Sequence, residues 1–295
     1  MSRRVLQGIA AVAILGCVAA GAYWVRTRSE RTIRAEARSL DSEPLSPPPA
    51  AIPSNAPAGP SATGSEKKVA SITDTGLPLR SGEVLEYAAN VANLNNVADL
   101  QLHVREHRSF LGKNAWHLQA FAHTENPLRM VFALDDQFDS YSDAATMTSL
   151  QYEMHLNERG QKVESIQRMT STGKEPAPPN VTETRVLPET RDPLGLMQYL
   201  RNVDWTKTAE VACPVYDGHA LYEVKARVVG ENQAVSVPAG SYKATKIEIR
   251  VFEHGQEMKD AHFTIYFANG ASHTPLLLEA VMPVATARVE LLHAK

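Results

Sequence analysis

Apolar and polar residues alternate with a period of two through most of the chain after residue 82. In residues 98–105 the apolar positions are Ala98, Leu100, Leu102 and Val104. Strands that bury one face and expose the other to solvent, as in antiparallel sheets, show this pattern. Turn signals such as Asn269-Gly270 separate the alternating runs. The other predicted strands are residues 116–122, 148–156, 221–229, 234–237, 242–252, 263–268, 276–282 and 287–292.

One segment, Arg191–Arg201, has the helical period instead. Asp192 can cap its N-terminus, and Pro193 suits the first turn, where a missing N–H costs nothing. Apolar residues cover more than half of the circumference, which is typical of a buried helix. We expect the Arg201 guanidinium to bond the last helix carbonyls or a carboxylate. The residues expected to hold this helix in the core are Asp192, Pro193, Leu196, Met197, Leu200 and Arg201.

Roughly a dozen strands and one helix predict a mainly β fold for residues 81–295. No repeat at solenoid or propeller periods is present. The simplest architecture is one large curved antiparallel sheet, an open half-barrel, around one central helix.

The N-terminal region, residues 1–26, contains an uncharged apolar run, Val5–Val25. As a helix it is about 31 Å long, which matches a bilayer core. We therefore expect a membrane anchor. A cleaved signal peptide and a lipoprotein signal ending at Cys17 are the alternatives. In either case the membrane is the expected partner of this segment.

Residues 27–80 are predicted to be a basic juxtamembrane segment followed by a Pro-rich linker. Arg26–Arg38 carries five Arg and two Glu, and the positive-inside rule alone would keep the body in the cytoplasm. Residues 41–65 contain seven Pro and almost no large apolar residue, so they cannot form a core. Residues 41–295 carry 23 basic against 31 acidic groups, which argues against nucleic acid as a partner.

Several short motifs resemble those of the bacterial family known as domain of unknown function 3108. They are Gly82–Tyr87, Asp192-Pro193-Leu194 with Tyr199-Leu200-Arg201, Tyr222-Glu223-Val224, Val237–Ala244 with Lys246, and Thr274-Pro275-Leu276. The resemblance covers about residues 80–293. It implies a half-barrel with a helix inside, similar to the periplasmic lipoprotein carriers, and an exported body. Together with the apolar run, this leads us to expect an inner-membrane anchor with the body in the periplasm; a lipoprotein or a body secreted after cleavage is the alternative. It supplies no catalytic residues. The usual Ser of the family is Gly195 here, which we expect to leave more room at that point.

The candidate chemistry is sparse. Asp135, Asp136 and Asp139 spell D-D-x-x-D, a metal–diphosphate pattern that works on a helix; here it lies among strands and turns, so a solvated strand end is expected. His103 and His107 alternate onto the polar face with Arg105, while no HExxH-like spacing occurs. Nucleophile-elbow and P-loop motifs are missing too. We therefore assign no catalytic, cofactor or metal residue.

Three functions remain open. The first is a membrane-tethered envelope protein that binds a lipid or another apolar ligand in a pocket formed by Trp116, Leu118, Phe121 and Tyr199. The second is a non-catalytic protein-interaction module whose concave face is filled by its own helix. The third is a hydrolase whose site has no linear motif. A tightly packed concave face would favour the second over the first.

Overall fold

The computed structural model describes residues 79–170, 178–281 and 286–295. The expected anchor, residues 1–26, and nearly all of the expected linker, residues 27–80, lie outside this part of the chain. In the described residues no helix combines the length and the apolar character that crossing a membrane requires.

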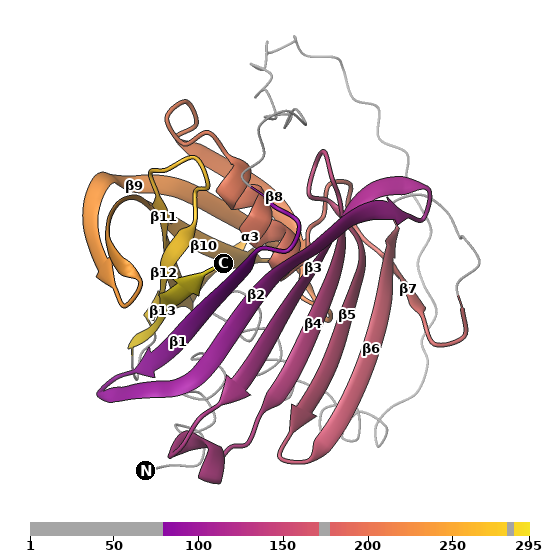
Figure 1. Cartoon of the computed structure of the whole chain (residues 1–295). Helices are drawn as coiled ribbons and strands as arrows, with labels where there is room; N and C mark the ends of the chain where they lie inside the picture. Colours follow the sequence, from indigo (N-terminus) through magenta and orange to yellow (C-terminus); the bar gives the residue numbers. More distant parts are fainter. Residues whose placement is uncertain (1–78, 171–177, 282–285) are drawn as a thin grey trace, which may run out of the picture.

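The described strands form one sheet that curves around a helix (Figure 1). The strands of the first half are β1 Val84–Val91, β2 Leu94–Phe110, β3 Lys113–Thr124, β4 Asp135–Asp143, β5 Ser149–Glu158, β6 Gln161–Thr170 and β7 Thr182–Arg185. Those of the second half are β8 Glu210–Tyr216, β9 Leu221–Val237, β10 Gly240–Glu253, β11 Gln256–Ala268, β12 Pro275–Val281 and β13 Thr286–Ala294.

The order of the strands is almost that of the sequence. Strands β1 to β7 follow one another to one edge of the sheet, and β8 to β13 return from the other edge until β13 pairs with β1. All pairs are antiparallel except β6 with β7. The sheet stays open because the edge strands β7 and β8 do not pair. This confirms the predicted class, a mainly β protein with a large curved antiparallel sheet around one helix.

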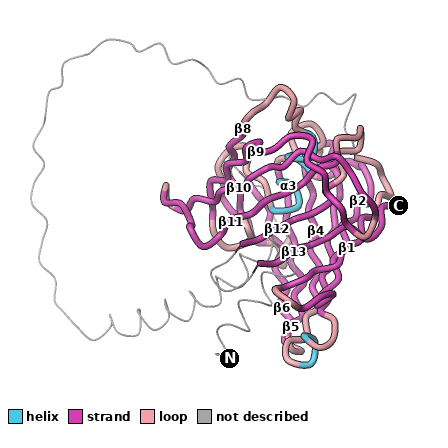
Figure 2. Tube along the Cα trace, turned by 90° about the vertical axis from the view of Figure 1, so that its left-hand side faces the viewer, coloured by secondary structure: helices cyan, strands magenta, loops and turns pink. Residues whose placement is uncertain are grey.

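The helix, α3 Pro193–Asn202, lies in the segment that connects the two edge strands. It sits between the two halves of the sheet in both views (Figures 1 and 2). Its residues Pro193 to Arg201 are all buried. Together with apolar side chains of both halves they form one continuous core.

The N-terminus of α3 is fixed to the first half of the sheet by a buried carboxylate. Asp192 Oδ1 accepts the backbone N–H groups of Leu194 and Gly195, each at 2.9 Å. Its Oδ2 accepts the hydroxyls of Ser140, at 2.6 Å, and Ser149. Burial raises the pKa of Asp192, and these hydrogen bonds oppose the rise.

The C-terminus of α3 is fixed by a buried cation. The Arg201 side chain is fully buried, and its Nη1 and Nη2 donate to Glu83 Oε2 and Oε1 at 2.6 and 2.7 Å. Its Nε donates to the Ser272 carbonyl at 2.7 Å. The carboxylate partner expected for Arg201 is therefore Glu83, which precedes β1. Both ends of the helix are tied to distant strands by charged groups.

The expectation that Gly195 leaves room is wrong. A Cβ placed on Gly195 would lie 2.9 Å from Ser142 Oγ, 3.0 Å from the Met147 carbonyl oxygen and 3.1 Å from Ser149 Oγ. Glycine therefore lets the helix backbone approach the first half of the sheet, and the space that a side chain would need is already filled.

Replacing Gly195 by Ala tests this packing. In an isolated helix the change would be favourable by about 1 kcal/mol. Here we expect the free energy of unfolding to fall by about 1 to 3 kcal/mol, because the added methyl group overpacks the contact with Ser142. Denaturant unfolding of the full chain measures it. The double variant with Ser142→Ala should recover part of the loss, and a single variant as stable as wild type would contradict the packing.

Candidate binding pocket

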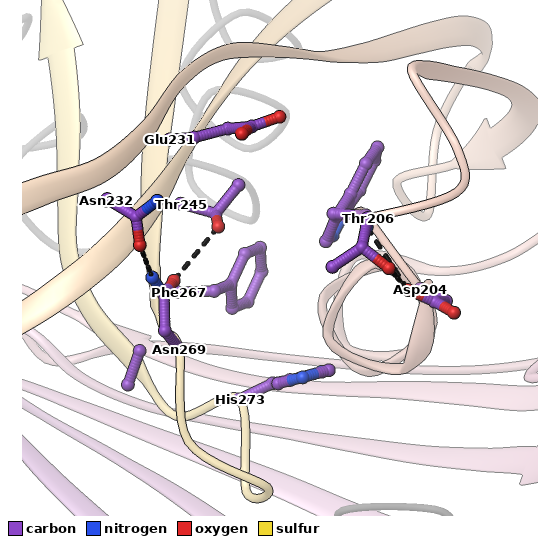
Figure 3. A pocket seen from close by; sticks show the side chains of 10 residues that line it. Asp204, Thr206, Glu231, Asn232, Thr245, Phe267, Asn269 and His273 are labelled. Carbon is purple, nitrogen blue, oxygen red and sulfur yellow. Dashed lines mark hydrogen bonds between the residues drawn. The ribbon is translucent and has the colours of Figure 1, made fainter.

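A pocket of about 270 Å³ opens beside the C-terminal end of α3 (Figure 3). It is formed by the loop after the helix, by β9 and β10, by the end of β11, and by the connection between β11 and β12. Its lining residues are Asp204, Trp205, Thr206, Glu231, Asn232, Thr245, Phe267, Ala268, Asn269 and His273.

A β-bulge creates one wall of the pocket. Ala244 pairs with Gln233 and Lys246 pairs with Gly230, so two residues of β9 stand opposite the single residue Thr245. These two residues are Glu231 and Asn232, and Asn232 has a positive φ of 52°. Such bulges re-aim side chains out of the regular pleat. The alternation of apolar and polar residues in β9 is therefore interrupted at the bulge, where polar side chains line the pocket.

A hydrogen-bonded chain of polar side chains covers this wall. Thr245 Oγ1 donates to Asn269 Oδ1 at 3.0 Å, and Asn269 Nδ2 donates to Asn232 Oδ1 at 2.9 Å (Figure 3). In the described part of the chain the amide nitrogen of Asn232 has no protein acceptor, so it can donate to a bound ligand. Glu231 adds an exposed carboxylate to the same wall.

The opposite wall presents a carboxylate held in its ionised form. Asp204 accepts the Lys207 ammonium at 2.7 Å and the Thr206 hydroxyl at 2.5 Å. The hydrogen bond from Lys207, followed by that from Thr206, lowers the pKa of Asp204 to about 2. At neutral pH Asp204 is therefore an acceptor for ligand hydroxyls and not a proton donor.

Two buried aromatic side chains complete the pocket. Trp205 donates through Nε1 to the Leu200 carbonyl at 2.9 Å, which fixes its ring. The Phe267 ring lies between the Asn232 and Asp204 walls in Figure 3. His273 Nδ1 contacts the Arg201 carbonyl at 3.0 Å, and among the described residues no hydrogen bond joins this imidazole to Asp204. A base held by a carboxylate, as a hydrolase would use, is not assembled here.

Of the four residues expected to form an apolar pocket, Leu118 and Tyr199 belong to one core cluster and Trp116 packs against it, whereas Phe121 is separated from them. Leu118 and Trp116 pair with Ser140 and Ser142 of β4 and lie on the same face of the sheet as these serines. Phe121 lies on the opposite face, edge-on to His103. Tyr199 is buried beneath the Arg191 guanidinium, which lies 3.7 Å from its ring centroid. In the described part of the protein the space between sheet and helix is filled by buried side chains of this core cluster, which also include Phe138, Tyr152, Met154, Leu196 and Leu200, so these residues form packed core and no open pocket.

The D-D-x-x-D residues lie on strand β4, where adjacent side chains point to opposite faces, so Asp135 and Asp136 are separated. Asp136 pairs with Ala122 and is buried on the helix-facing side, where it accepts the Asn157 N–H at 2.8 Å. Asp135 is on the other face and bonds Arg129. The expected solvated strand end is therefore wrong for Asp136. Burial raises its pKa to about 7.

Asp136 should make the stability of the protein depend on pH. Its folded pKa is above its unfolded value, so between about pH 4 and pH 7 only the folded state holds the proton, and stability falls as the pH rises. We expect Asp136→Asn to remove this loss. When the pH is raised from 4.5 to 7.5, the difference in free energy of unfolding between Asp136→Asn and wild type should change by about 2 to 4 kcal/mol in favour of the variant.

Urea unfolding of the full chain at the two pH values measures the effect. Asp135→Asn is the matched control, because Arg129 lowers the pKa of Asp135 and its contribution is lost only at more acidic pH. Equal pH profiles for wild type and Asp136→Asn would show that Asp136 is ionised in the fold.

A second bulge, in β2, makes the positions of His103 and His107 differ from the prediction. Val104 pairs with Leu118 and Glu106 pairs with His117, so one residue of β2 has no counterpart. His103 and His107 therefore lie on opposite faces of the sheet, not on one polar face as predicted. His107 packs on Trp116, with the ring centroids 4.8 Å apart.

The pocket residues form no linear motif in the sequence. They come from the loop after the helix, a bulge and a turn, which are far apart in the chain. The usable signal was the gap at residues 230–233 between two predicted strands. The structure shows one continuous strand, β9, in which that gap is the bulge.

Residues 86–292 match the model of a family described as "Protein of unknown function (DUF3108)". The chain is similar to a beta-barrel-like protein of domain of unknown function DUF1849 from Brucella abortus, with a TM-score of 0.47 and 11% identity over 73% of this chain and 97% of that chain. It is also similar to a proposed lipoprotein from Parabacteroides distasonis (TM-score 0.34, 12% identity, 74% and 97% covered). A proposed exported protein with a YmcC-like fold from Bacteroides fragilis has a TM-score of 0.30 and 10% identity, with 74% and 98% covered. Among curated proteins none matches.

Proposed function

We propose that this chain, which belongs to the DUF3108 family, is a non-catalytic binding protein of the bacterial cell envelope that recognises a polyhydroxylated ligand, such as a saccharide unit. The observation that carries the proposal is the lining of the pocket. Trp205 and Phe267 are buried among asparagine, threonine and carboxylate groups.

The chemistry of a sugar ring matches this lining. A sugar has an apolar C–H face, which packs on aromatic rings, and hydroxyls that both donate and accept hydrogen bonds. The Asn232 amide nitrogen supplies a donor, and the oxygens of the Asp204 and Glu231 side chains supply acceptors. The volume of about 270 Å³ lies just below the usual range for ligand pockets, which suits one or two sugar units.

A lipid carrier is less well supported by the same structure. An acyl chain needs a continuous apolar cavity, whereas the inner face of the sheet is occupied by α3 and its neighbours. This is the packed concave face that favours an interaction module over a lipid carrier. We infer that recognition takes place at the pocket and on the surface of the body.

The proposed location rests on the sequence. The uncharged run Val5–Val25 would anchor the chain in the inner membrane, with the body in the periplasm. A Pro-rich tether of about 40 residues has an extended limit of about 120 Å, so the body could reach ligands away from the bilayer.

Binding of simple sugars to the detergent-purified full chain tests the proposal. We expect at least one of glucose, galactose and N-acetylglucosamine to bind with a Kd of about 0.1 to 1 mM in calorimetry. Asn232→Ala should weaken this binding about tenfold, since one hydrogen bond to the ligand is lost.

Asn114→Ala is the matched control, because Asn114 is an exposed asparagine at the far end of β3 and outside the pocket. Equal weakening by both variants would contradict the assignment of the pocket. If no sugar binds at about 10 mM while a fluorescent fatty acid binds one per chain, the lipid carrier is the better interpretation.

A further inference from the structure

The face of the first half of the sheet opposite α3, called here the outer face, carries a ladder of polar side chains. Ser140 bonds the helix cap Asp192, so its neighbour Asp139 points to the other side of β4. On that side Asp139 pairs with Glu153 of β5 and Gln137 pairs with His155. Three potential metal ligands therefore stand side by side on two adjacent strands.

The three side chains are close enough to share one ion. One ligand atom of each of Asp139, Glu153 and His155 lies within 4.8 Å of the other two. The side chain of Asp139 is 6% exposed, that of Glu153 16% and that of His155 32%. The cluster is thus shielded at Asp139 and reachable from solvent at His155.

The two acids stand directly opposite each other, and imidazoles are the groups beside them: His117 Nε2 lies 2.6 Å from Asp139, and His155 Nε2 lies 3.5 Å from Glu153. Like charges directly opposite each other on neighbouring strands destabilise a sheet, and more so when they are buried. Among the described residues no lysine or arginine bonds either Asp139 or Glu153. On the same face, the acidic group around Asp135 and His123 already contains its own cation, Arg129, at 3.0 Å from Asp135.

Neighbouring side chains hold the carboxylates and leave specific positions open. Asp139 Oδ1 accepts hydrogen bonds from His117 Nε2 and Gln119 Nε2, both at 2.6 Å, and among the described residues its Oδ2 accepts one, from Gln137 Nε2 at 2.7 Å. A carboxylate oxygen has two lone pairs, so Oδ2 keeps one.

The second acid is held in the same way. Glu153 Oε1 accepts Gln151 Nε2 at 2.6 Å, while Oε2 lies 3.5 Å from His155 Nε2, too far for a strong hydrogen bond. Amide donors that orient ligating carboxylates are the usual surroundings of a metal site.

We propose that Asp139, Glu153 and His155 bind a divalent transition-metal ion, with Zn²⁺ as the fitting ion, on the outer face of the sheet. One imidazole and two carboxylates are a ligand set that zinc accepts. Two of the ligands lie on β5 and one on β4, so no linear motif such as HExxH indicates the site in the sequence. The proposal departs from the expectation that no metal residue is present, and it does not depend on the ligand of the pocket.

The geometry needs only a small adjustment to close around the ion. Ligands at about 2.0 to 2.2 Å from Zn²⁺ stand about 3.4 Å apart in a tetrahedron. Rotation of the partly exposed His155 and Glu153 side chains can bring them in, while Asp139 stays fixed by its three hydrogen bonds. Three protein ligands leave a fourth position for water or for an external ligand.

Metal titration of the full chain, stripped with a chelator, tests the site. We expect wild type to bind one Zn²⁺ with a Kd of about 1 µM or lower in competition with a chromophoric chelator. Cobalt should give visible absorption bands of a low-coordinate site. Glu153→Gln and His155→Gln should each weaken binding by at least tenfold. Excess Zn²⁺ should raise the Tm of wild type and not of His155→Gln.

The matched controls are His123→Gln and Glu106→Gln, the same substitutions at positions outside the cluster. Circular dichroism confirms that each variant is folded. The proposal is overturned if wild type binds no zinc at tenfold excess, if Glu153→Gln and His155→Gln bind as wild type does, or if His123→Gln loses as much affinity as His155→Gln. The wild-type titration decides even where a variant fails to fold.

Discussion

The buried charges at the two ends of α3 are the constraint on which the sheet depends. A carboxylate at the N-terminus and a guanidinium at the C-terminus are both removed from water, and each is stable only because it is fully hydrogen-bonded. Asp192 finds its donors on β4 and β5, and Arg201 finds its acceptors before β1 and after β11. Removal of one partner of such a pair leaves an uncompensated charge and typically costs about 3 to 5 kcal/mol. The helix therefore fixes the relative position of strands that do not pair with one another.

The same helix accounts for where a ligand can bind. Its apolar circumference fills the inside of the curved sheet, which removes the cavity that an acyl chain would need. Its last carbonyls, at Leu200 and Arg201, hold Trp205 and His273 in place at the pocket. The pocket is thus built on the helix terminus, although it opens away from the core.

The alternation of apolar residues predicted the strands that bury one face, and the helical period predicted α3. These elements sufficed for the fold class. The bulges in β2 and β9 could not be predicted, because an inserted residue reverses the side on which every later side chain lies without changing the composition. The close approach at Gly195 was hidden for a different reason. Glycine permits both open space and tight contact, and only the positions of Ser142 and Met147 decide between them.

The alternation does not predict strand β4, nor β1, β6, β7 and β8, and for β4 the physical reason is clear. Its sequence, DDQFDSYSD, has polar residues on both faces. On the inner face Ser140 serves the buried cap of α3 and Asp136 caps a backbone N–H, whereas on the outer face Asp139 belongs to the proposed metal site. Departures from a binary pattern are expected where polar groups have a specific task. Because Asp139 and Ser140 are adjacent in the chain, an ion that fixes Asp139 would also restrain the backbone that carries Ser140. The helix cap and the proposed metal site therefore share one strand, and each limits how far the other can move.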